Sequence, residues 1–346
     1  MNLIQEPAPK TCIVILGMHR SGTSALAAVI SMLGITPGAN LQPPQAEVNV
    51  KGFWEHSGIV AIHEQLLETL GSSWHDDRPL PDQSWSSPDV AKLRQKILDT
   101  LHRDFSSEHM WLIKDPRMCR LLPLWRDVFR ELACQSKFIL VLRHPGEVAC
   151  SLRKRDGLTE EQTCLLWLAY MLEAEYQTRG QPRVFASYGR LLEEWQLTAA
   201  TIGQGLGVVW PVTAEEASSS INAFLDPSLR HYAGYTELPE HPACRLALKG
   251  FELLSAPRPD PSSLDDLRAE VKELVAVVSP WSKRLQLIDR QNCNLRSSNA
   301  KFDLENRVLR TEVARIKGTV SWRITKPVRA IWNILRLLLP SSSAKR

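Results

Sequence analysis

The segment that decides the fold is CIVILGMHRSGTSALAAVISMLG, residues 12–34. An apolar run from Cys12 to Leu16 meets a glycine, then a polar turn, and then a stretch of small and apolar residues. A short apolar run suits a strand, and the stretch after the turn suits a helix. The segment therefore predicts a strand, a tight turn and a helix in succession.

The turn of this segment has the glycine spacing of a phosphate-binding loop without its lysine. In a nucleoside-triphosphate loop, G-x-x-x-x-G-K-[ST], the lysine reaches the terminal phosphates. Gly17 and Gly22 keep this spacing, but Thr23 occupies the lysine position and Arg20 stands ahead of Gly22. Backbone N–H groups of residues 21–24 can still surround an anion, and arginine adds a fixed charge. An ordinary strand-to-helix turn is the alternative.

The composition of the chain limits the possible classes of function. A chain of 346 residues can bury a full core, and its net charge of +4 is too mild to indicate nucleic acid. The seven cysteines form no C-x-x-C pair and are typical of reduced core residues in a cytosolic protein. The start, MNLIQEPAPKT, has no signal-sequence pattern, and no segment reaches the roughly 18 apolar residues of a membrane span. We therefore expect a cytoplasmic protein.

Strand-like runs alternate with helical patterns from residue 12 to about residue 255. Continuous apolar runs, which suit strands buried on both faces of a parallel sheet, occur at 12–17, 110–114, 137–142 and 183–187. Helical patterns follow at 22–34, 120–133, 146–154 and 189–206. This order predicts a doubly wound α/β domain.

A second basic turn follows the third of these runs. In FILVLRHPGEVACSL, Arg143 ends the strand, and Ser151 lies one or two turns into the next helix. Ligands of open parallel sheets bind at the carboxyl ends of the strands. Arg143 and Ser151 are therefore expected to bind a second anion near the first loop. Two anion sites at one sheet edge suggest a nucleotide with phosphates at both ends of its ribose.

Both basic turns resemble motifs of the sulfotransferase family. GMHRSGTSAL (17–26) is similar to its 5′-phosphosulfate loop, and RHPGEVACSL (143–152) is similar to its 3′-phosphate motif. The resemblance to bacterial members extends over residues 11–235. It implies a three-layer α/β/α sandwich with a mainly parallel, P-loop-like sheet. It also implies 3′-phosphoadenosine 5′-phosphosulfate (PAPS) as the sulfuryl donor, with no metal.

The resemblance also implies a role for each matching residue. Arg20 takes the position of the catalytic cation, which would neutralise charge growing on the bridging oxygen as the sulfuryl group leaves. The donor contacts implied are His19, Ser21, Gly22, Thr23 and Ser24 at the 5′-phosphate, Arg143 and Ser151 at the 3′-phosphate, and Tyr188 near the nucleotide. A half-buried core tyrosine is the alternative for Tyr188.

Sulfuryl transfer to a hydroxyl also needs a base. Glu55, in GFWEH, is favoured because a carboxylate near cationic Arg20 stays ionised. The other candidates are His19, His56, His63 and His144, of which His19 and His144 are equally suited to structural hydrogen bonds.

A third strand end, in IKDPR, adds charged residues at the same edge of the sheet. Lys114 and Arg117 are predicted to bind the donor sulfate or an anionic acceptor. Asp115, between them, could imitate the magnesium-binding aspartate of P-loop proteins, but no other residue supports a metal.

The pattern changes after a proline- and serine-rich segment, 256–263, which is predicted to be a linker. From 264 to 317, apolar residues recur at a 3-4 spacing, as at the a and d positions of a coiled coil. Three successive a positions carry Asn292, Asn299 and Asn306, which would fix register and oligomeric state in a homodimer. Long helices folded back on the globular domain are the alternative. Pro280 predicts a kink or a break.

The last segment, 318–346, is predicted to hold a basic amphipathic helix. Trp332 and several leucines share one face, and Arg329 and Arg336 lie on the other. Such a helix suits either a membrane surface, at the inner face of the membrane, or a protein surface.

Three functions are consistent with these patterns. The favoured one is a PAPS-dependent sulfotransferase acting on a hydroxyl, with a carbohydrate or lipid-linked glycan as the expected acceptor. The glycan expectation follows from the ending SWRITKP, which resembles endings of bacterial cell-surface glycan enzymes. The alternatives are a P-loop small-molecule kinase and a non-catalytic nucleotide-binding coiled-coil scaffold.

Overall fold

One parallel sheet forms the centre of the fold in the computed structural model, which describes residues 10–44, 51–81, 85–225, 234–325, 327, 328 and 331. The strands are β1 (Thr11–Leu16), β2 (Met110–Lys114), β3 (Gln135–Leu142) and β4 (Arg183–Ser187). They lie in the order β2-β1-β3-β4, and every neighbouring pair is parallel. Each strand lies within two residues of its predicted position.

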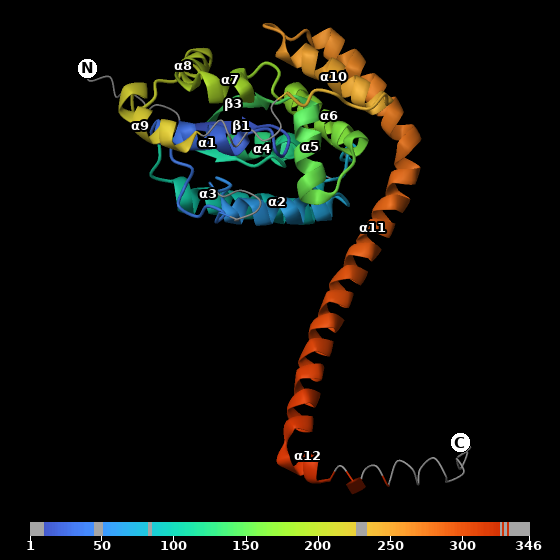
Figure 1. The fold of residues 1–346 in the computed structure, drawn as a ribbon. Coiled ribbons are helices and arrows are strands. Elements are labelled where there is room, and N and C mark those ends of the chain that lie inside the picture. Colours follow the sequence, from blue (N-terminus) through green and yellow to red (C-terminus); the bar gives the residue numbers. More distant parts are fainter. Residues whose placement is uncertain are drawn as a thin grey trace, which may run out of the picture. The chain divides into compact units, whose positions relative to one another are not determined.

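Helices cover both faces of the sheet, as Figure 1 shows for α8 and α9 on one side and α2 and α3 on the other. The helices are α1 (Thr23–Met32), α2 (Ser57–Thr69), α3 (Pro88–Phe105), α4 (Met118–Glu131), α5 (Pro145–Asp156), α6 (Glu160–Gln177), α7 (Tyr188–Glu193), α8 (Trp195–Leu206), α9 (Ala214–Phe224), α10 (Pro242–Ser255), α11 (Pro261–Gly318) and α12 (Val320–Ile324). The helix predicted at 189–206 is divided at Glu194 into α7 and α8.

The alternation of side chains along each strand produces two separate apolar cores. Cys12, Val14 and Leu16 of β1 pack with α2, α3, α4 and α6, whereas Ile13 and Ile15 pack with α1, α8 and α9. Both faces of β1 are therefore buried, as expected for the centre of a parallel sheet. This arrangement confirms the predicted three-layer α/β/α fold. Six cysteines are buried and form no disulfide: Cys12, Cys119, Cys134, Cys150, Cys164 and Cys244.

The start of α11 belongs to the globular unit. The chain divides into two compact units, Met1–Val277 and Val278–Arg346. Leu264, Leu267, Val271 and Val275 are at most 9% exposed and pack in the core that contains α6 and α10. The predicted linker ends early, because α11 already begins at Pro261. The first positions of the predicted coiled coil are thus part of the N-terminal core. Of the two alternatives predicted at Pro280, a break is excluded because α11 continues through this residue, and a kink stays a prediction.

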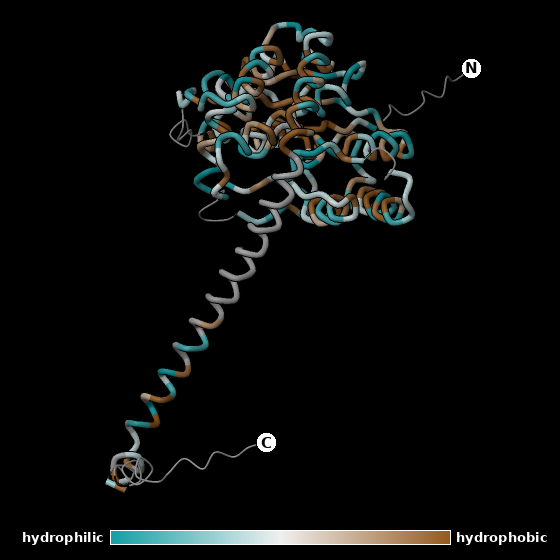
Figure 2. The backbone as a smooth tube through the Cα atoms, turned by 90° about the vertical axis from the view of Figure 1, so that its right-hand side faces the viewer, coloured by the Kyte–Doolittle hydropathy of each residue, from teal (hydrophilic) through white to brown (hydrophobic). Residues whose placement is uncertain are grey.

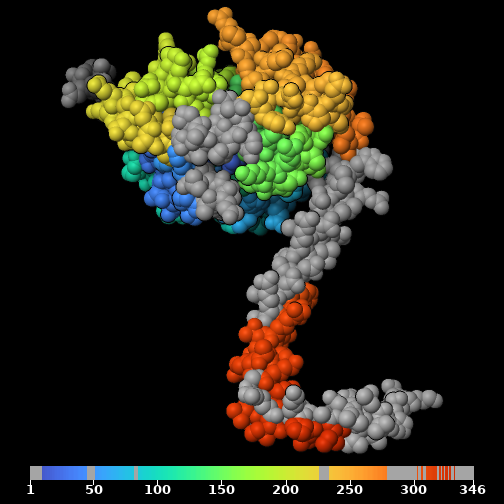
Figure 3. Space-filling model, in the orientation of Figure 1, coloured from blue at the N-terminus to red at the C-terminus, as the bar shows by residue number. Residues whose placement is uncertain are grey.

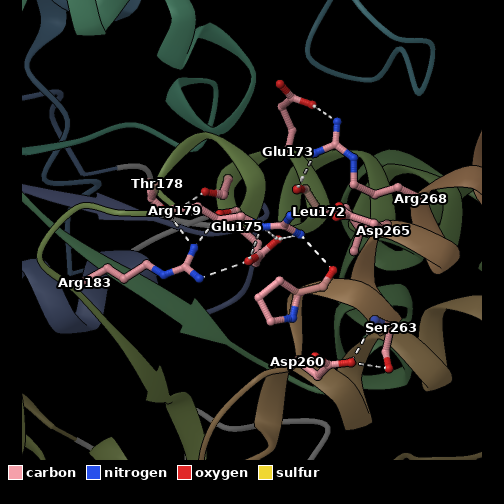
Figure 4. Close-up of polar contacts among 12 residues, drawn as sticks. Leu172, Glu173, Glu175, Thr178, Arg179, Arg183, Asp260, Ser263, Asp265 and Arg268 are labelled. Carbon is pink, nitrogen blue, oxygen red and sulfur yellow. Dashed lines mark hydrogen bonds and ion pairs between the residues drawn. The ribbon is translucent and has the colours of Figure 1, made fainter.

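A buried carboxylate joins α6 to this first part of α11 (Figure 4). Glu175 is fully buried and accepts hydrogen bonds from Arg179 at 2.8 Å and from Arg183 at 3.0 Å. Arg179 also contacts the Asp265 carboxylate at 2.9 Å and donates to the backbone oxygen of Pro261 at 3.3 Å. Glu175 therefore holds the arginine that connects the two helices.

No described helix combines the length and the apolar character needed to cross a bilayer. Most of the predicted amphipathic tail, including Trp332 and Arg336, lies outside the described residues.

We expect Glu175→Gln to lower the free energy of unfolding of the globular unit by about 3 kcal/mol, because two partly buried arginines lose their shared charge partner. Asp265→Asn is the matched control. Asp265 is 52% exposed, so its ion pair is screened by water and its loss should cost clearly less than the loss of Glu175. Urea unfolding of both variants measures the difference, and equal losses would contradict the central role of Glu175.

Candidate functional site

The loop between β1 and α1 turns through left-handed backbone conformations. Gly22 has φ +88°, and a Cβ there would lie 2.0 Å from the Tyr188 ring. Arg20 has φ +69°, which is costly for a residue with a side chain. The N–H of Ser21 donates to the backbone oxygen of Met18 at 3.1 Å, closing the turn. The loop is thus held in a conformation that only glycine permits at position 22.

The two predicted anion-binding motifs meet at Arg20. Its Nε donates to Ser151 Oγ at 2.8 Å, and its backbone oxygen accepts a hydrogen bond from Arg143 Nη1 at 2.7 Å. These contacts join the first loop to residues more than 120 positions later in the chain. The structure therefore brings Arg20, Arg143 and Ser151 together, as the sequence predicts.

Arg143 is fixed from several sides. Its Nε donates to Glu147 at 2.8 Å, and its guanidinium carbon lies 4.8 Å from the centre of the Tyr188 ring. Trp167 donates to its backbone oxygen at 3.1 Å. Arg143 is only 8% exposed, so the guanidinium has a defined position before any ligand binds. Tyr188 lies between this guanidinium and Gly22, and it is 8% exposed in the core formed with α1, α8 and α9. Its predicted place near the nucleotide stays a prediction.

Two further arginines, Arg143 and Arg155, add positive charge next to Arg20. Burial lowers the pKa of Arg20, and the neighbouring charges of Arg155 and Arg143 lower it further. Repulsion between cations has this effect, because it disfavours the protonated form. An anion bound among these arginines would relieve the repulsion, so this edge of the sheet is suited to an anion.

A lysine from β2 reaches the same loop. Lys114 Nζ donates to Ser24 Oγ and to the backbone oxygen of Phe53, each at 2.9 Å, and it forms an ion pair with Glu55. Thr23, at the lysine position of a nucleoside-triphosphate loop, is 3% exposed and faces Gly17 with its methyl group. Lys114, on the neighbouring strand β2, thus places an amine beside a loop that has no lysine of its own.

Glu55 lies beside Lys114, which is its cationic partner. The sequence predicts Arg20 as this partner, because residue spacing does not show that Lys114 reaches across from β2. One oxygen of Glu55 pairs with Lys114, and Oε2 is buried without a hydrogen-bond partner among the described residues. Burial raises the pKa of Glu55, and the Lys114 charge opposes this rise.

Three of the candidate histidines have structural roles. His63 Nε2 accepts from Trp125 at 2.8 Å, so its Nδ1 carries the proton and donates to Asp115 at 2.8 Å. The Nδ1 atoms of His56 and His144 accept backbone N–H groups at the starts of α2 and α5. None of these three rings therefore has the arrangement of a catalytic base.

Asp115 and Arg117 form one network at the end of β2. Burial raises the pKa of Asp115, but the Arg117 charge and a hydrogen bond from His63 outweigh burial and hold this pKa well below its usual range. Arg117 also pairs with Glu64. Its predicted contact with the donor or acceptor remains a prediction, since two carboxylates already balance its charge. No group of three or more potential metal ligands occurs within the described ranges.

His19 lies in an aromatic environment next to the loop. Its ring centre is 4.9 Å from that of Trp74 and 5.7 Å from that of Tyr170. Its Nε2 is buried and has no hydrogen-bond partner among the described residues, as is also true of Ser21 Oγ. Burial and the charges of Arg117 and Arg155 hold the pKa of His19 well below its usual value. His19 is thus favoured in its neutral form.

Sequence reasoning missed Glu147, Arg155 and Trp74. Arg155 lies four residues after Ser151, and both belong to α5, so helical spacing predicts that they share one face of this helix. Glu147 lies four residues after Arg143, which precedes α5, so helical spacing gave no such signal for Glu147. Trp74, over which Arg155 lies at 5.4 Å, is in an irregular loop and had no such signal.

Comparisons with known proteins give limited information. No protein-family model and no curated protein matches the chain. Among solved structures, a sulfotransferase domain from the Synechococcus PCC 7002 olefin synthase is 21% identical, with a TM-score of 0.38, over 76% of this chain and 96% of that chain. A sulfotransferase domain from the curacin biosynthetic pathway is 15% identical, with a TM-score of 0.36, over 77% and 98%. Similarities of this size do not decide a function, so the function must follow from the residues of the site.

Gly22→Ala is expected to remove nucleotide binding and to destabilise the fold by more than the about 1–2 kcal/mol of a left-handed alanine, because its Cβ would also overlap the Tyr188 ring. Gly71→Ala is the control, with φ +66° and no atom within 4 Å of the added Cβ. Thermal unfolding and calorimetric titration with 3′-phosphoadenosine 5′-phosphate (PAP) compare the two. Retained PAP affinity in Gly22→Ala would contradict the geometry of the loop.

Proposed function

We propose that the protein is a PAPS-dependent sulfotransferase that moves a sulfuryl group to a hydroxyl acceptor. The observation that carries this proposal is the 2.8 Å contact between Arg20 Nε and Ser151 Oγ. It joins a loop suited to a 5′-phosphosulfate with a motif suited to a 3′-phosphate. A nucleotide with phosphates at both ends of its ribose fits such a pair of adjoining sites, whereas ATP offers phosphates at one end only.

Each residue of the site has a role in this reaction. The N–H groups of Gly22, Thr23 and Ser24 at the start of α1 would bind the 5′-phosphate. As the bond between the sulfur and the bridging oxygen breaks, Arg20 neutralises the negative charge that grows on that oxygen. Glu55 Oε2 accepts the proton of the acceptor hydroxyl while the new sulfur–oxygen bond forms. The products are PAP and the sulfated acceptor.

Glu55 suits the role of base better than any of the candidate histidines except His19. A raised pKa brings a carboxylate closer to the operating pH, where proton transfer is most effective. The other oxygen, Oε1, is paired with Lys114, which fixes the orientation of the carboxylate. Neutral His19 is the alternative base, because its Nε2 also lacks a partner among the described residues.

For the acceptor, we propose a carbohydrate or lipid-linked glycan. Aromatic side chains commonly present an apolar face and a polar edge to their partners, and Trp74 lies next to His19 of the loop. The tail resemblance supports the same class, and a basic amphipathic tail would suit an acceptor at a membrane surface. The tail itself lies mainly outside the described residues.

A P-loop kinase remains the second candidate because Lys114 Nζ reaches Ser24 Oγ at 2.9 Å and could replace the missing loop lysine. Titration with PAP and with ATP and Mg²⁺ separates the two functions. A sulfotransferase should bind PAP more tightly, and a kinase should bind ATP with Mg²⁺ more tightly. If neither ligand raised the melting temperature, the chain would be a non-catalytic scaffold.

Arg20→Ala should lower the rate of sulfuryl transfer from PAPS by at least about 100-fold, because the charge on the leaving oxygen loses its cation. The fold and PAP binding should be largely kept, as measured by thermal unfolding with and without PAP. Arg20→Lys is the control, since it keeps the charge and should retain part of the activity. Full turnover of Arg20→Ala would refute its catalytic role.

Glu55→Gln should lower kcat by roughly 10²–10⁴-fold if Glu55 is the base. In the unchanged protein, activity should fall as the pH drops through the raised pKa of Glu55, above its ordinary value of 4.5. Lys114→Met should move this acidic limb to higher pH, because the lysine charge lowers that pKa, whereas Lys114→Arg should move it less. A limb that stays in place in Lys114→Met would assign it to another group, with His19 next to be tested.

A further inference from the structure

The C-terminal part of α11 exposes a row of large apolar side chains. Phe302, Leu309, Val313 and Ile316 are between 43% and 61% exposed, in contrast to the buried apolar residues at the start of the same helix. Figure 2 shows hydrophobic and hydrophilic residues alternating along this part, and Figure 3 shows its coloured residues exposed on the face that is drawn. A single helix with such a row lacks the burial that stabilises most helices in proteins.

The spacing of this row defines one narrow seam. Phe302, Leu309 and Ile316 occupy successive d positions, and Val313 occupies an a position. A seam of a and d residues is the contact surface of a coiled coil, narrower than the stripe that packs against a globular core. The a position between Phe302 and Leu309 is Asn306, which is exposed.

Asn306 restricts what can cover the seam. A buried amide needs a hydrogen-bond partner, and an apolar groove or an apolar d position offers none. In a parallel, in-register pair, each a position faces the same a position of the other helix, so asparagine meets asparagine. The same heptad position holds Asn292 and Asn299 in the sequence, so three successive layers impose the same requirement.

We propose that residues 278–317 of two copies of this chain form a parallel, in-register, two-stranded coiled coil. The occupant of the seam is therefore a second copy of the same chain. The residues before 278 are excluded from this interface, because their apolar positions are already buried in the globular unit. In a parallel pair, both globular units leave the coiled coil at the same end.

The charges that flank the seam are complementary in this arrangement. In parallel coiled coils, each g residue faces the e residue five positions later on the other helix. Glu305 then faces the partner's Arg310, and Glu312 faces the partner's Lys317. These four residues are exposed. Glu312 now pairs with Arg315 at 2.7 Å within its own helix, an exposed contact that can be exchanged.

The heptads before residue 302 have compatible charges at the same contacts. Between the two helices, the g and e residues that would face each other are Arg284 and Asp289, Gln291 and Arg296, and Ser298 and Asp303. None of these pairs brings like charges together. The charge pattern therefore favours the second copy of this chain over an unrelated helix.

A charge-exchange experiment on the full-length chain tests the orientation. Variant one carries Glu305→Lys and Glu312→Lys, and variant two carries Arg310→Glu and Lys317→Glu. In a parallel pair, each variant alone places like charges at both g–e contacts, whereas a mixture of the two restores opposite charges. In an antiparallel pair, g faces g and e faces e, so the variants alone would associate like the original chain.

Light scattering should give twice the chain mass of 39.1 kDa for the original chain. Each variant alone should dimerise with a dissociation constant at least about tenfold higher, because like charges face each other. The mixture of the two variants should again form dimers. Equal melting temperatures of the globular unit show that the variants are folded. A monomeric original chain would mean that the seam is covered by the chain itself or by another partner. Variants that dimerise as tightly as the original chain would refute the parallel pairing.

Discussion

The parallel pairing of β1 with β3 is the constraint on which the site depends. Leu16, the last residue of β1, is in register with Leu140, two residues before β3 ends. The loop after β1 and the turn after β3 therefore emerge at the same edge of the sheet. Because of this, Arg20 and Ser151 meet at 2.8 Å although they are 131 positions apart. An antiparallel pairing would have placed them at opposite edges.

The chemistry of this edge follows from positive charge that is held in place before a ligand arrives. Arg143 is fixed by Glu147 and Tyr188, and Arg20 is fixed by Ser151. Cations held close together repel each other, and a doubly phosphorylated donor would relieve this repulsion. Donors arranged in advance need little reorganisation during the reaction, which is why such sites stabilise developing charge effectively. Lys114 and Glu55 add a cation and a carboxylate on the other side of the loop.

Local sequence patterns predict those features of the fold that depend on residues close together in the chain. The strands, the loop with Arg20 and the spacing of Arg143 and Ser151 are all short-range features that the sequence shows directly. The pairing of Lys114 with Glu55 joins residues 59 positions apart, so no local pattern could reveal it. The same holds for His63, whose role depends on Trp125 and Asp115. Leu264 and Leu267 follow the heptad pattern in the sequence, but they are buried in the core of the globular unit and do not belong to a coiled coil.

The central claim is that the two basic motifs form one site for a nucleotide with both a 3′-phosphate and a 5′-phosphate. Calorimetric titration with PAP and with adenosine 5′-phosphate, which lacks the 3′-phosphate, tests it most directly. The account predicts that PAP binds at least about tenfold more tightly, and that Ser151→Ala removes much of this difference, because a hydrogen bond to a charged group contributes more than 1 kcal/mol. Equal affinities for the two nucleotides would contradict the claim.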